Sequence, residues 1–205
     1  MVRALRIAGN VFILLGLTFL FFVVYEVYGT SAITKQAQAA LAIEWERPLP
    51  PAPTQTAEPE EAPPPPPGSA VARIVIPKIG VDWIVVEGVS LDSLAKGPGH
   101  YTGTAYPGEL GTVGIAGHRT GWNFIFADLD QLQKGDTIIL ERRGGKRFTY
   151  RVTDTTIVKP GNVSVLNGDP NSSALKALTL TTCTPKYTSL ERLIVWADQV
   201  DPPLS

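Results

Sequence analysis

The sequence predicts a mainly β domain that follows one membrane-spanning helix and a proline-rich linker. Three features support this: an uncharged apolar run near the N-terminus, a proline-dense segment after it, and short β-branched runs separated by Gly, Pro and Asp in the remainder. Short strands with turn signals between them are typical of an antiparallel sheet that closes into a barrel or packs as a sandwich. A chain of 205 residues holds one medium-sized domain plus such segments.

The apolar run extends from Ile7 to Tyr25 without a charged residue. A helix of this length, rising about 1.5 Å per residue, spans a hydrocarbon core of roughly 30 Å. Arg3 and Arg6 precede the run, so the positive-inside bias places the N-terminus in the cytoplasm. A cleaved signal peptide is the alternative, but the small-residue pattern at 37–39 lies far beyond the run. We therefore assign residues 1–30 to a cytoplasmic N-terminus and a transmembrane anchor.

Residues 31–69 are expected to form an extracellular linker. Residues 31–45 are rich in helix formers and can extend the membrane helix outward by a few turns. The stretch from Pro48 to Pro67 contains ten prolines. Such a stretch is typical of a semi-rigid polyproline spacer, here reaching on the order of 60 Å. A ligand for proline-binding domains is the alternative, but a position between a membrane span and a domain favours the spacer.

Residues 70–205 contain seven β-branched runs that we interpret as strands. They are residues 71–76, 82–87, 112–117, 136–141, 147–158, 177–183 and 191–198. Helical pattern is scarce, with room for a turn or two at 90–96, 123–133 and 171–177. A domain of this size buries a substantial core by itself.

Composition excludes several classes of function. The net charge of -1 and the lack of a Lys/Arg block argue against a nucleic-acid partner. No spacing typical of a zinc or calcium site occurs, so we expect no metal and no cofactor. The single cysteine cannot form an internal disulfide. Outside the cell, such an odd thiol indicates intermolecular pairing or a free reactive group.

The single cysteine, Cys183, ends the strand that starts at Leu178. Alternation along a strand places Leu178 and Leu180 on one face and Thr181 and Cys183 on the other. A thiol that only filled core space would fit the leucine face better, whereas this one lies on a hydroxyl-lined face. A buried structural cysteine remains the alternative at this point. A reactive thiol would need an electropositive, accessible site.

Two other residues supply chemistry that such a thiol requires. His118 follows a strand with Gly114 and Ala116 on its own face, and these small residues leave room beside the imidazole. A structural, hydrogen-bonded histidine is the alternative. Arg192 lies nine residues after Cys183, so a hairpin can bring its guanidinium, a strong hydrogen-bond donor, close to the thiol. A surface salt bridge is the alternative for Arg192. The second histidine, His100, is expected to brace a loop or lie on the surface.

Together, Ala116-Gly-His118, the strand Thr-Leu-Thr-Thr-Cys183 and Arg192 resemble the motifs of the sortases, the cysteine transpeptidases of Gram-positive cell surfaces. The phrases Gly-Pro-Gly-His-Tyr-Thr-Gly-Thr-Ala at 97–105 and Thr-Cys-Thr-Pro-Lys-Tyr at 182–187 look most like class E, with class D next. The resemblance implies a closed eight-stranded β-barrel over residues 70–205, anchored in the cell membrane by a single span with the catalytic domain outside.

The resemblance also implies a two-step acyl transfer. Cys183 would attack the Thr–Gly bond of a C-terminal sorting signal, and His118 would protonate the leaving amine and later activate the incoming one. Arg192 would hold the substrate and stabilise the oxyanion. The partners would be surface proteins that carry a sorting signal and an amine of a peptidoglycan precursor such as lipid II. A pilin-polymerising sortase and a non-catalytic binding barrel displayed on the surface are the alternatives.

Three further residues are candidates for substrate binding. The motif around the cysteine implies this role for Thr182 and Tyr187. Class E sortases favour a signal similar to Leu-Ala-x-Thr-Gly over Leu-Pro-x-Thr-Gly. Tyr101 is the candidate for reading that difference, because a phenol can hydrogen-bond the backbone N–H that alanine has and proline lacks. Ordinary packing of a loop residue is the alternative for Tyr101.

Overall fold

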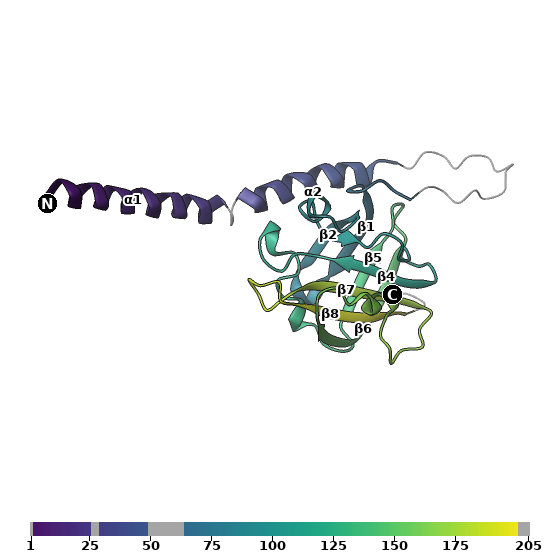
Figure 1. The fold of residues 1–205 in the computed structure, drawn as a ribbon. Helices are drawn as coiled ribbons and strands as arrows, with labels where there is room; N and C mark the ends of the chain where they lie inside the picture. The colour runs from purple at the N-terminus through teal and green to yellow at the C-terminus, as the bar shows by residue number, and fades with distance from the viewer. Residues whose placement is uncertain (1, 26–28, 49–63, 201–205) are drawn as a thin grey trace.

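The computed structural model describes residues 2–25, 29–48 and 64–200. Eight strands close into a barrel in the order β1-β2-β3-β4-β7-β8-β6-β5 (Figure 1). The strands are β1 (Ala70–Ile76), β2 (Val81–Glu87), β3 (Gly99–His100), β4 (Gly111–Ala116), β5 (Thr137–Glu141), β6 (Arg147–Val158), β7 (Lys176–Thr184) and β8 (Glu191–Val200). The closed-barrel prediction is therefore confirmed, and the seven expected strands all form.

The barrel departs from an antiparallel sheet at two pairs of strands. The short strand β3 runs parallel to β2, and β4 runs parallel to β7. The sequence does not predict β3, because two residues between turns leave no visible alternation. The parallel β4–β7 pair has the larger consequence, since it places the ends of two strands that are distant in sequence next to each other.

The core fills the inside of the barrel with the apolar faces of these strands. Leu178 and Leu180 of β7 are fully buried in it, as the alternation predicts. Tyr150 and Phe126 are among the largest side chains of this core. The opposite face of β7, which carries Thr181 and Cys183, therefore points out of the barrel.

Short helices connect the strands. They are α3 (Leu91–Leu94) and the 3₁₀ helices η2 (Pro77–Ile79), η3 (Trp122–Phe124), η4 (Leu129–Gln131) and η5 (Val163–Asn167). The expected helical turns at 90–96 and 123–133 are thus present in shorter form. The helix expected at 171–177 is wrong, because the chain there forms a turn and then enters β7 at Lys176.

Two long helices precede the barrel. The first, α1 (Val2–Val24), buries none of its residues against the protein. Within the described parts of the chain it is the one helix that is long and apolar enough to cross a membrane. The second, α2 (Thr30–Glu46), covers the region that the sequence assigns to a linker. It is a separate helix that packs against the barrel (Figure 1).

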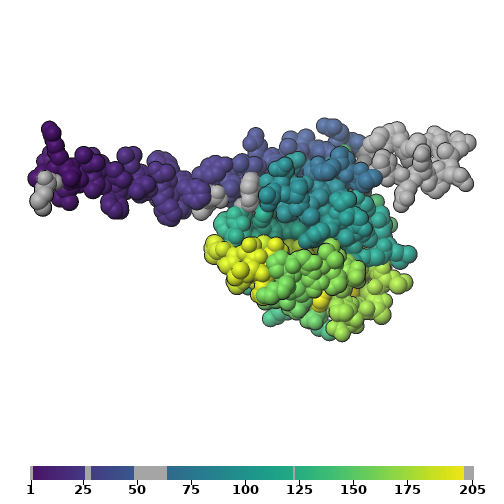
Figure 2. Space-filling model, in the orientation of Figure 1, coloured from purple at the N-terminus to yellow at the C-terminus, as the bar shows by residue number. Residues whose placement is uncertain are grey.

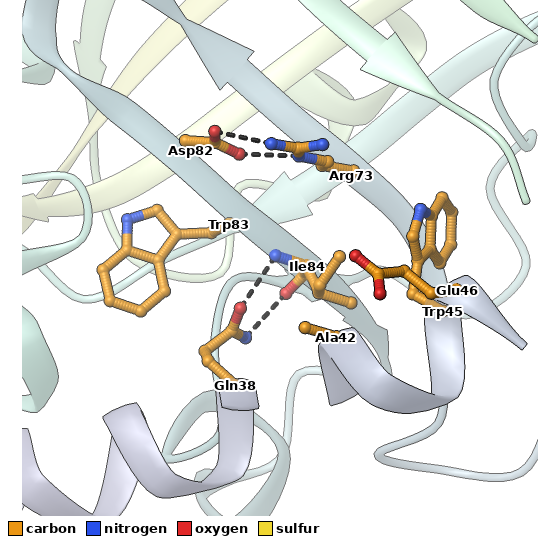
Figure 3. Close-up of a pocket in the computed structure, with 8 residues that line it drawn as sticks. All are labelled: Gln38, Ala42, Trp45, Glu46, Arg73, Asp82, Trp83 and Ile84. Atoms are coloured by element: carbon orange, nitrogen blue, oxygen red, sulfur yellow. Dashed lines mark hydrogen bonds and ion pairs between the residues drawn. The ribbon is translucent and has the colours of Figure 1, made fainter. Parts of the chain in front are cut away.

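Polar side chains of α2 hold it against the barrel. The Gln38 amide makes a reciprocal pair with the backbone of Ile84: its Nε2 donates to the Ile84 carbonyl at 2.9 Å, and its Oε1 accepts from the Ile84 N–H at 2.8 Å (Figure 3). The fully buried Thr34 donates to the Ala95 carbonyl at 2.8 Å. Leu41 adds an apolar contact with Ile84 and its neighbours on β2. With these contacts, α2 and the barrel form one body.

The docking of α2 also concerns the flanks of the proline-rich stretch. Residues 49–63 lie outside the described residues, but both flanks of the stretch are attached to the barrel. At one flank, Arg143 of the β5–β6 turn donates to the carbonyls of Glu44 and Arg47. At the other flank, the Gly68 N–H donates to Glu87 of β2 at 2.8 Å. The residues on both sides of the stretch therefore contact the barrel. The predicted polyproline spacer itself falls mostly outside the described residues and stays a prediction.

Candidate active site

Cys183 and Arg192 face each other across the β7–β8 pair. The two residues are direct cross-strand partners in the antiparallel register. Opposite residues of such a pair carry their side chains on the same face, with Cβ atoms about 4.5–5.5 Å apart. Cys183 is a free, half-buried thiol. The hairpin that the short connection predicts is therefore present, and it brings the guanidinium to the side of the thiol.

His118 reaches the same place from β4. In the parallel β4–β7 pair, Ala116 is the partner of Thr181. Two hydrogen bonds continue this register beyond the strand: the Gly117 N–H donates to the Thr181 carbonyl at 3.0 Å, and Thr182 Oγ1 donates to the Gly117 carbonyl at 2.8 Å. One residue further along each chain are His118 and Cys183. The ends of β4, β7 and β8 thus carry His118, Cys183 and Arg192 side by side.

A cavity of about 260 Å³ lies on the outer face of these strands. Its walls include Thr181, two residues before Cys183, and Arg192, which is opposite Cys183. The helix η5 covers this face, because Thr179 Oγ1 and Trp196 Nε1 both donate to the Val165 carbonyl at 2.9 Å. The remaining lining residues are Tyr101, Val158, Lys159, Gly161, Asn162, Val163, Val165, Leu166 and Ile194. The cavity therefore reaches Arg192, the cross-strand partner of Cys183, and has a mixed apolar and polar lining that does not include Cys183 or His118.

Tyr101 forms part of the cavity wall. Its hydroxyl lies 2.9 Å from Thr181 Oγ1, so the phenol is directed at the strand that carries the thiol. Gly114 of β4 makes room for the ring: a Cβ at this position would lie 3.1 Å from Tyr101 and from Leu166. Gly114 on the strand before His118 therefore leaves the space that Tyr101 and Leu166 of the cavity wall occupy.

The loop that carries Tyr101 is fixed by a buried histidine and carboxylate. His100 Nδ1 lies 2.9 Å from Glu87 Oε2, and both side chains are almost fully buried. His100 Nε2 lies 3.1 Å from the Ala105 carbonyl and 3.0 Å from Thr104 Oγ1. The Tyr106 ring stacks on the imidazole with centroids 4.6 Å apart. His100 therefore braces the loop, and the expectation of a surface position is wrong.

Arg119, the residue after His118, is a buried member of the site that sequence reasoning did not identify. Its Nη1 donates to Thr184 Oγ1 at 2.6 Å, and its Nη2 pairs with Asp130 at 2.9 Å. The side chain is only 6% exposed. Arg119 thus links the segment after β4 to the end of β7. The available signal was its position directly beside His118, although an arginine there reads equally well as a surface residue.

The electrostatics of the site favour a neutral imidazole next to the thiol. Burial lowers the pKa of His118 below its usual value of 6.5, because removal from water disfavours the charged form. A neutral imidazole can accept the thiol proton, and the imidazolium that results can then donate it.

Among the described residues, no acidic side chain forms with Arg192 the salt bridge that was the alternative explanation for it. Arg192 Nη1 donates to the carbonyls of Ser189 and Glu191, while the Glu191 carboxylate pairs with Lys159 at 3.2 Å. The guanidinium is thus held by the backbone of the β7–β8 turn while it lines the cavity. From this position its charge can stabilise an oxyanion that forms beside Cys183.

The other two expected substrate-binding residues lie elsewhere. Thr182 is 2% exposed and directs its hydroxyl to the Gly117 carbonyl, so it sits on the strand face opposite the cavity. Its contact positions the residue before His118. Tyr187, in the β7–β8 connection, is 82% exposed and is not part of the cavity lining.

The family model and the most similar known proteins all indicate the same family. A family model described as "Sortase domain" matches residues 74–200. Sortase SrtE1 of Streptomyces coelicolor is 35% identical over 216 residues, which cover 98% of this chain and 58% of SrtE1. Sortase SrtE2 of the same organism is 31% identical over 213 residues, covering 97% of this chain and 83% of SrtE2. The chain therefore spans little more than half the length of SrtE1.

A solved structure of similar fold is that of the Clostridium perfringens Sortase D5 transpeptidase. It aligns with a TM-score of 0.63 and 30% identity over 83% of this chain and 99% of that one. The relatives thus include class E and class D sortases, as the motifs around His118 and Cys183 suggest. With a family model over most of the chain, a matching barrel and a free cysteine beside a histidine and an arginine, the chain belongs to the sortase family of cysteine transpeptidases.

Proposed function

We propose that this protein is a membrane-anchored sortase that cleaves a C-terminal sorting signal between Thr and Gly and joins the new acyl group to an amine. The observation that carries the proposal is the row of His118, Cys183 and Arg192 at the adjoining ends of three neighbouring strands, where Arg192 also lines a cavity. Nucleophile, proton carrier and oxyanion donor then act on a single bound carbonyl.

In the first step, Sγ of Cys183 attacks the threonine carbonyl carbon while the thiol proton passes to the neutral imidazole of His118. The carbonyl oxygen gains negative charge beside Arg192, which stabilises it. The C–N bond to glycine then breaks, and the imidazolium donates its proton to the leaving amine. The products are a thioester on Cys183 and a released peptide with a free amino group.

In the second step, an amine attacks the thioester carbonyl carbon. His118 accepts a proton from this amine, the C–S bond breaks, and the sulfur of Cys183 recovers the proton through the imidazole. One amide bond is lost in the first step and one is formed in the second, so no external energy source or redox partner is required. The acceptor we propose is an amine of a peptidoglycan precursor such as lipid II.

Tyr101 is the residue we propose to recognise the second position of a Leu-Ala-x-Thr-Gly signal. Support comes from its place in the cavity wall, with the hydroxyl directed at Thr181. A phenol oxygen in this position can accept a hydrogen bond from the N–H of alanine, which proline lacks.

The helix α1 is the membrane anchor in this proposal, with the N-terminus in the cytoplasm and the barrel outside the cell. Support comes from its apolar, unburied surface and from the cations Arg3 and Arg6 at its start. In this orientation the thiol works outside the cell, where surface proteins and peptidoglycan precursors are present.

The test is cleavage of a Leu-Ala-x-Thr-Gly peptide by the whole chain in detergent, with and without a soluble amine. Cys183→Ala is expected to abolish both cleavage and transfer, because no other thiol exists in the sequence. Leu175→Ala, a change at an exposed residue before the far end of β7, serves as the control with unchanged rates. Cleavage that persists in Cys183→Ala would exclude this residue as the nucleophile.

A further inference from the structure

The connection between the two N-terminal helices fixes how far the barrel can lie from a membrane. Only residues 25–29 separate α1 from α2. A chain of this length spans at most about 20 Å even when fully extended. At the far end of this connection, Thr30 is 4% exposed. Because α2 is bound to the barrel through Gln38 and Thr34, this limit applies to the barrel itself.

The part of the barrel nearest this connection carries the active-site loops. The helix α2 contacts η3, which follows His118 in the chain, and Figure 1 shows this segment beneath the first turns of α2. Lys186 in the β7–β8 connection pairs with Asp128 at 3.1 Å, so this connection lies beside the segment after His118. We call residues 122–128 and 185–190 the active-site rim.

The active-site rim projects toward the side of α1. In Figure 2 the yellow atoms of the β7–β8 connection form the outermost projection of the barrel on the side where α1 joins α2. The opposite end of the same strand, where Leu175 precedes β7, lies about 30 Å away along nine residues of strand. One end of the barrel is therefore held near the bilayer and the other end points away from it.

The surface of the rim has the composition of a membrane contact. Tyr187 and Leu190 are 82% and 68% exposed, and Phe124 is 38% exposed. Both aromatic residues have a positive φ, 67° for Tyr187 and 53° for Phe124, which is an unfavourable backbone for bulky side chains. Aromatic residues are enriched at the level of lipid headgroups, where one end of the ring is apolar and the other is wet. The Lys186–Asp128 pair adds no net charge that would oppose a lipid surface.

We propose that the active-site rim rests on the bilayer in which α1 is embedded, with Tyr187 and Leu190 inserted at headgroup level. The inference uses the proposed function in one respect, since it requires α1 to span the membrane. The contact holds the row of His118, Cys183 and Arg192 at the height where a lipid-linked amine presents its headgroup. The sorting signal then approaches from the side of the cavity that faces away from the lipid.

The experiment places an environment-sensitive fluorophore on the rim of the whole chain. In a Cys183→Ser background, Leu190→Cys provides one labelling site, and Leu175→Cys provides a matched control at the other end of β7, where the leucine is 77% exposed against 68% for Leu190. The labelled proteins are reconstituted in vesicles of zwitterionic and anionic phospholipids that contain a spin-labelled quencher near the headgroups. The label at position 190 is expected to shift to the blue and lose emission, and the label at 175 is expected to do neither.

Equal, unquenched emission at both positions would overturn the inference. An alkaline carbonate wash of the same vesicles separates this failure from a failure of the anchor. If the chain washes off the vesicles, α1 does not span the membrane and both proposals fall. If the chain resists the wash while the label at 190 stays unquenched, the anchor stands and the rim contact alone is wrong.

A second variant connects the contact to catalysis. Leu190→Gln, with Cys183 intact, is expected to cleave a soluble peptide at the unchanged rate but to lose transfer to a lipid-linked amine in vesicles. A soluble amine serves as the control acceptor for the same protein. Equal losses with both acceptors would mean that Leu190 binds the peptide, and unchanged transfer to both would mean that the rim does not orient the site.

Discussion

Arg119 Nη1 donates a hydrogen bond of 2.6 Å to Thr184 Oγ1, which joins the residue after His118 to the residue after Cys183. The two segments are distant in the chain, and Arg119 is buried where they meet. Its contacts therefore help set the spacing between the imidazole and the thiol.

Arg119→Met, which keeps an unbranched aliphatic stem but removes the guanidinium donors, should lower kcat with little change in KM, because the cavity lining is untouched. It should also destabilise the fold by about 1–3 kcal/mol, since Thr184 loses its partner in a buried position. Peptide cleavage and urea unfolding check the two effects. Asp130→Asn is the control, and because Asp130 is half exposed its cost should stay below about 1 kcal/mol. A normal kcat in Arg119→Met would contradict the positioning role.

The lowered pKa of His118 predicts a loss of stability in acid. As pH falls below 6.5, the unfolded chain binds a proton at His118 before the folded chain does, so folding becomes less favourable until pH passes the lower folded pKa. The contribution is complete at pH values above 6.5. Its slope cannot exceed about 1.4 kcal/mol per pH unit, because at most one proton distinguishes the unfolded from the folded chain at His118.

Urea unfolding at pH 5–8, compared between the natural protein and His118→Asn, isolates this effect. The difference in free energy of unfolding should shift in favour of His118→Asn as pH falls. Parallel pH profiles for the two proteins would show that His118 has the same pKa in the folded and unfolded chains.

Tyr101→Phe tests how the second position of the signal is read. Loss of one hydrogen bond to the alanine N–H should lower kcat/KM for a Leu-Ala-x-Thr-Gly peptide by about 2- to 10-fold, and leave a Leu-Pro-x-Thr-Gly peptide unaffected. Thr181→Val is the matched control, because it removes the partner of the Tyr101 hydroxyl but keeps the phenol. If the natural protein prefers proline, both the class E specificity and this role of Tyr101 are wrong.

Glu87→Gln tests the brace beneath the loop of Tyr101. The Glu87 carboxylate contacts His100 and accepts hydrogen bonds from Thr102 and Tyr106, and an amide offers one acceptor oxygen in place of two. A buried donor left without a partner should cost about 1–3 kcal/mol in urea unfolding. Asp82→Asn breaks the exposed pair with Arg73 and should cost at most about 1 kcal/mol. Equal costs for the two variants would show that burial does not strengthen the Glu87 pair.

The outcome for individual residues shows which features the sequence predicts. The pairing of Cys183 with Arg192 could be predicted from the sequence, because two strands joined by so short a connection most simply form a hairpin. The strand face of Cys183 followed from alternation alone. The proximity of His118 to Cys183 could not be derived in this way, since it depends on a parallel pairing of strands 65 residues apart.

Contacts made by polar side chains were the least predictable. Residues 30–46 read as a polar helix in a linker, because the residues that attach the helix, Thr34 and Gln38, are also common on exposed surfaces. The burial of Arg119 and of His100 was not predictable either, because each residue bonds to a partner from another part of the chain: Thr184 for Arg119 and Glu87 for His100. The sequence pattern shows where apolar faces lie, but it does not show which polar groups find buried partners.

The reciprocal Gln38–Ile84 hydrogen bonds have a consequence for the limits of the domain. The family model begins at residue 74, and the strand pattern begins at 70, so both leave α2 outside. A shortened protein that starts at either position would expose Leu41's partners on β2 and leave two backbone groups of Ile84 without their amide partner. We therefore expect the smallest autonomous folding unit to begin near Thr30, because α2 completes the surface of β2.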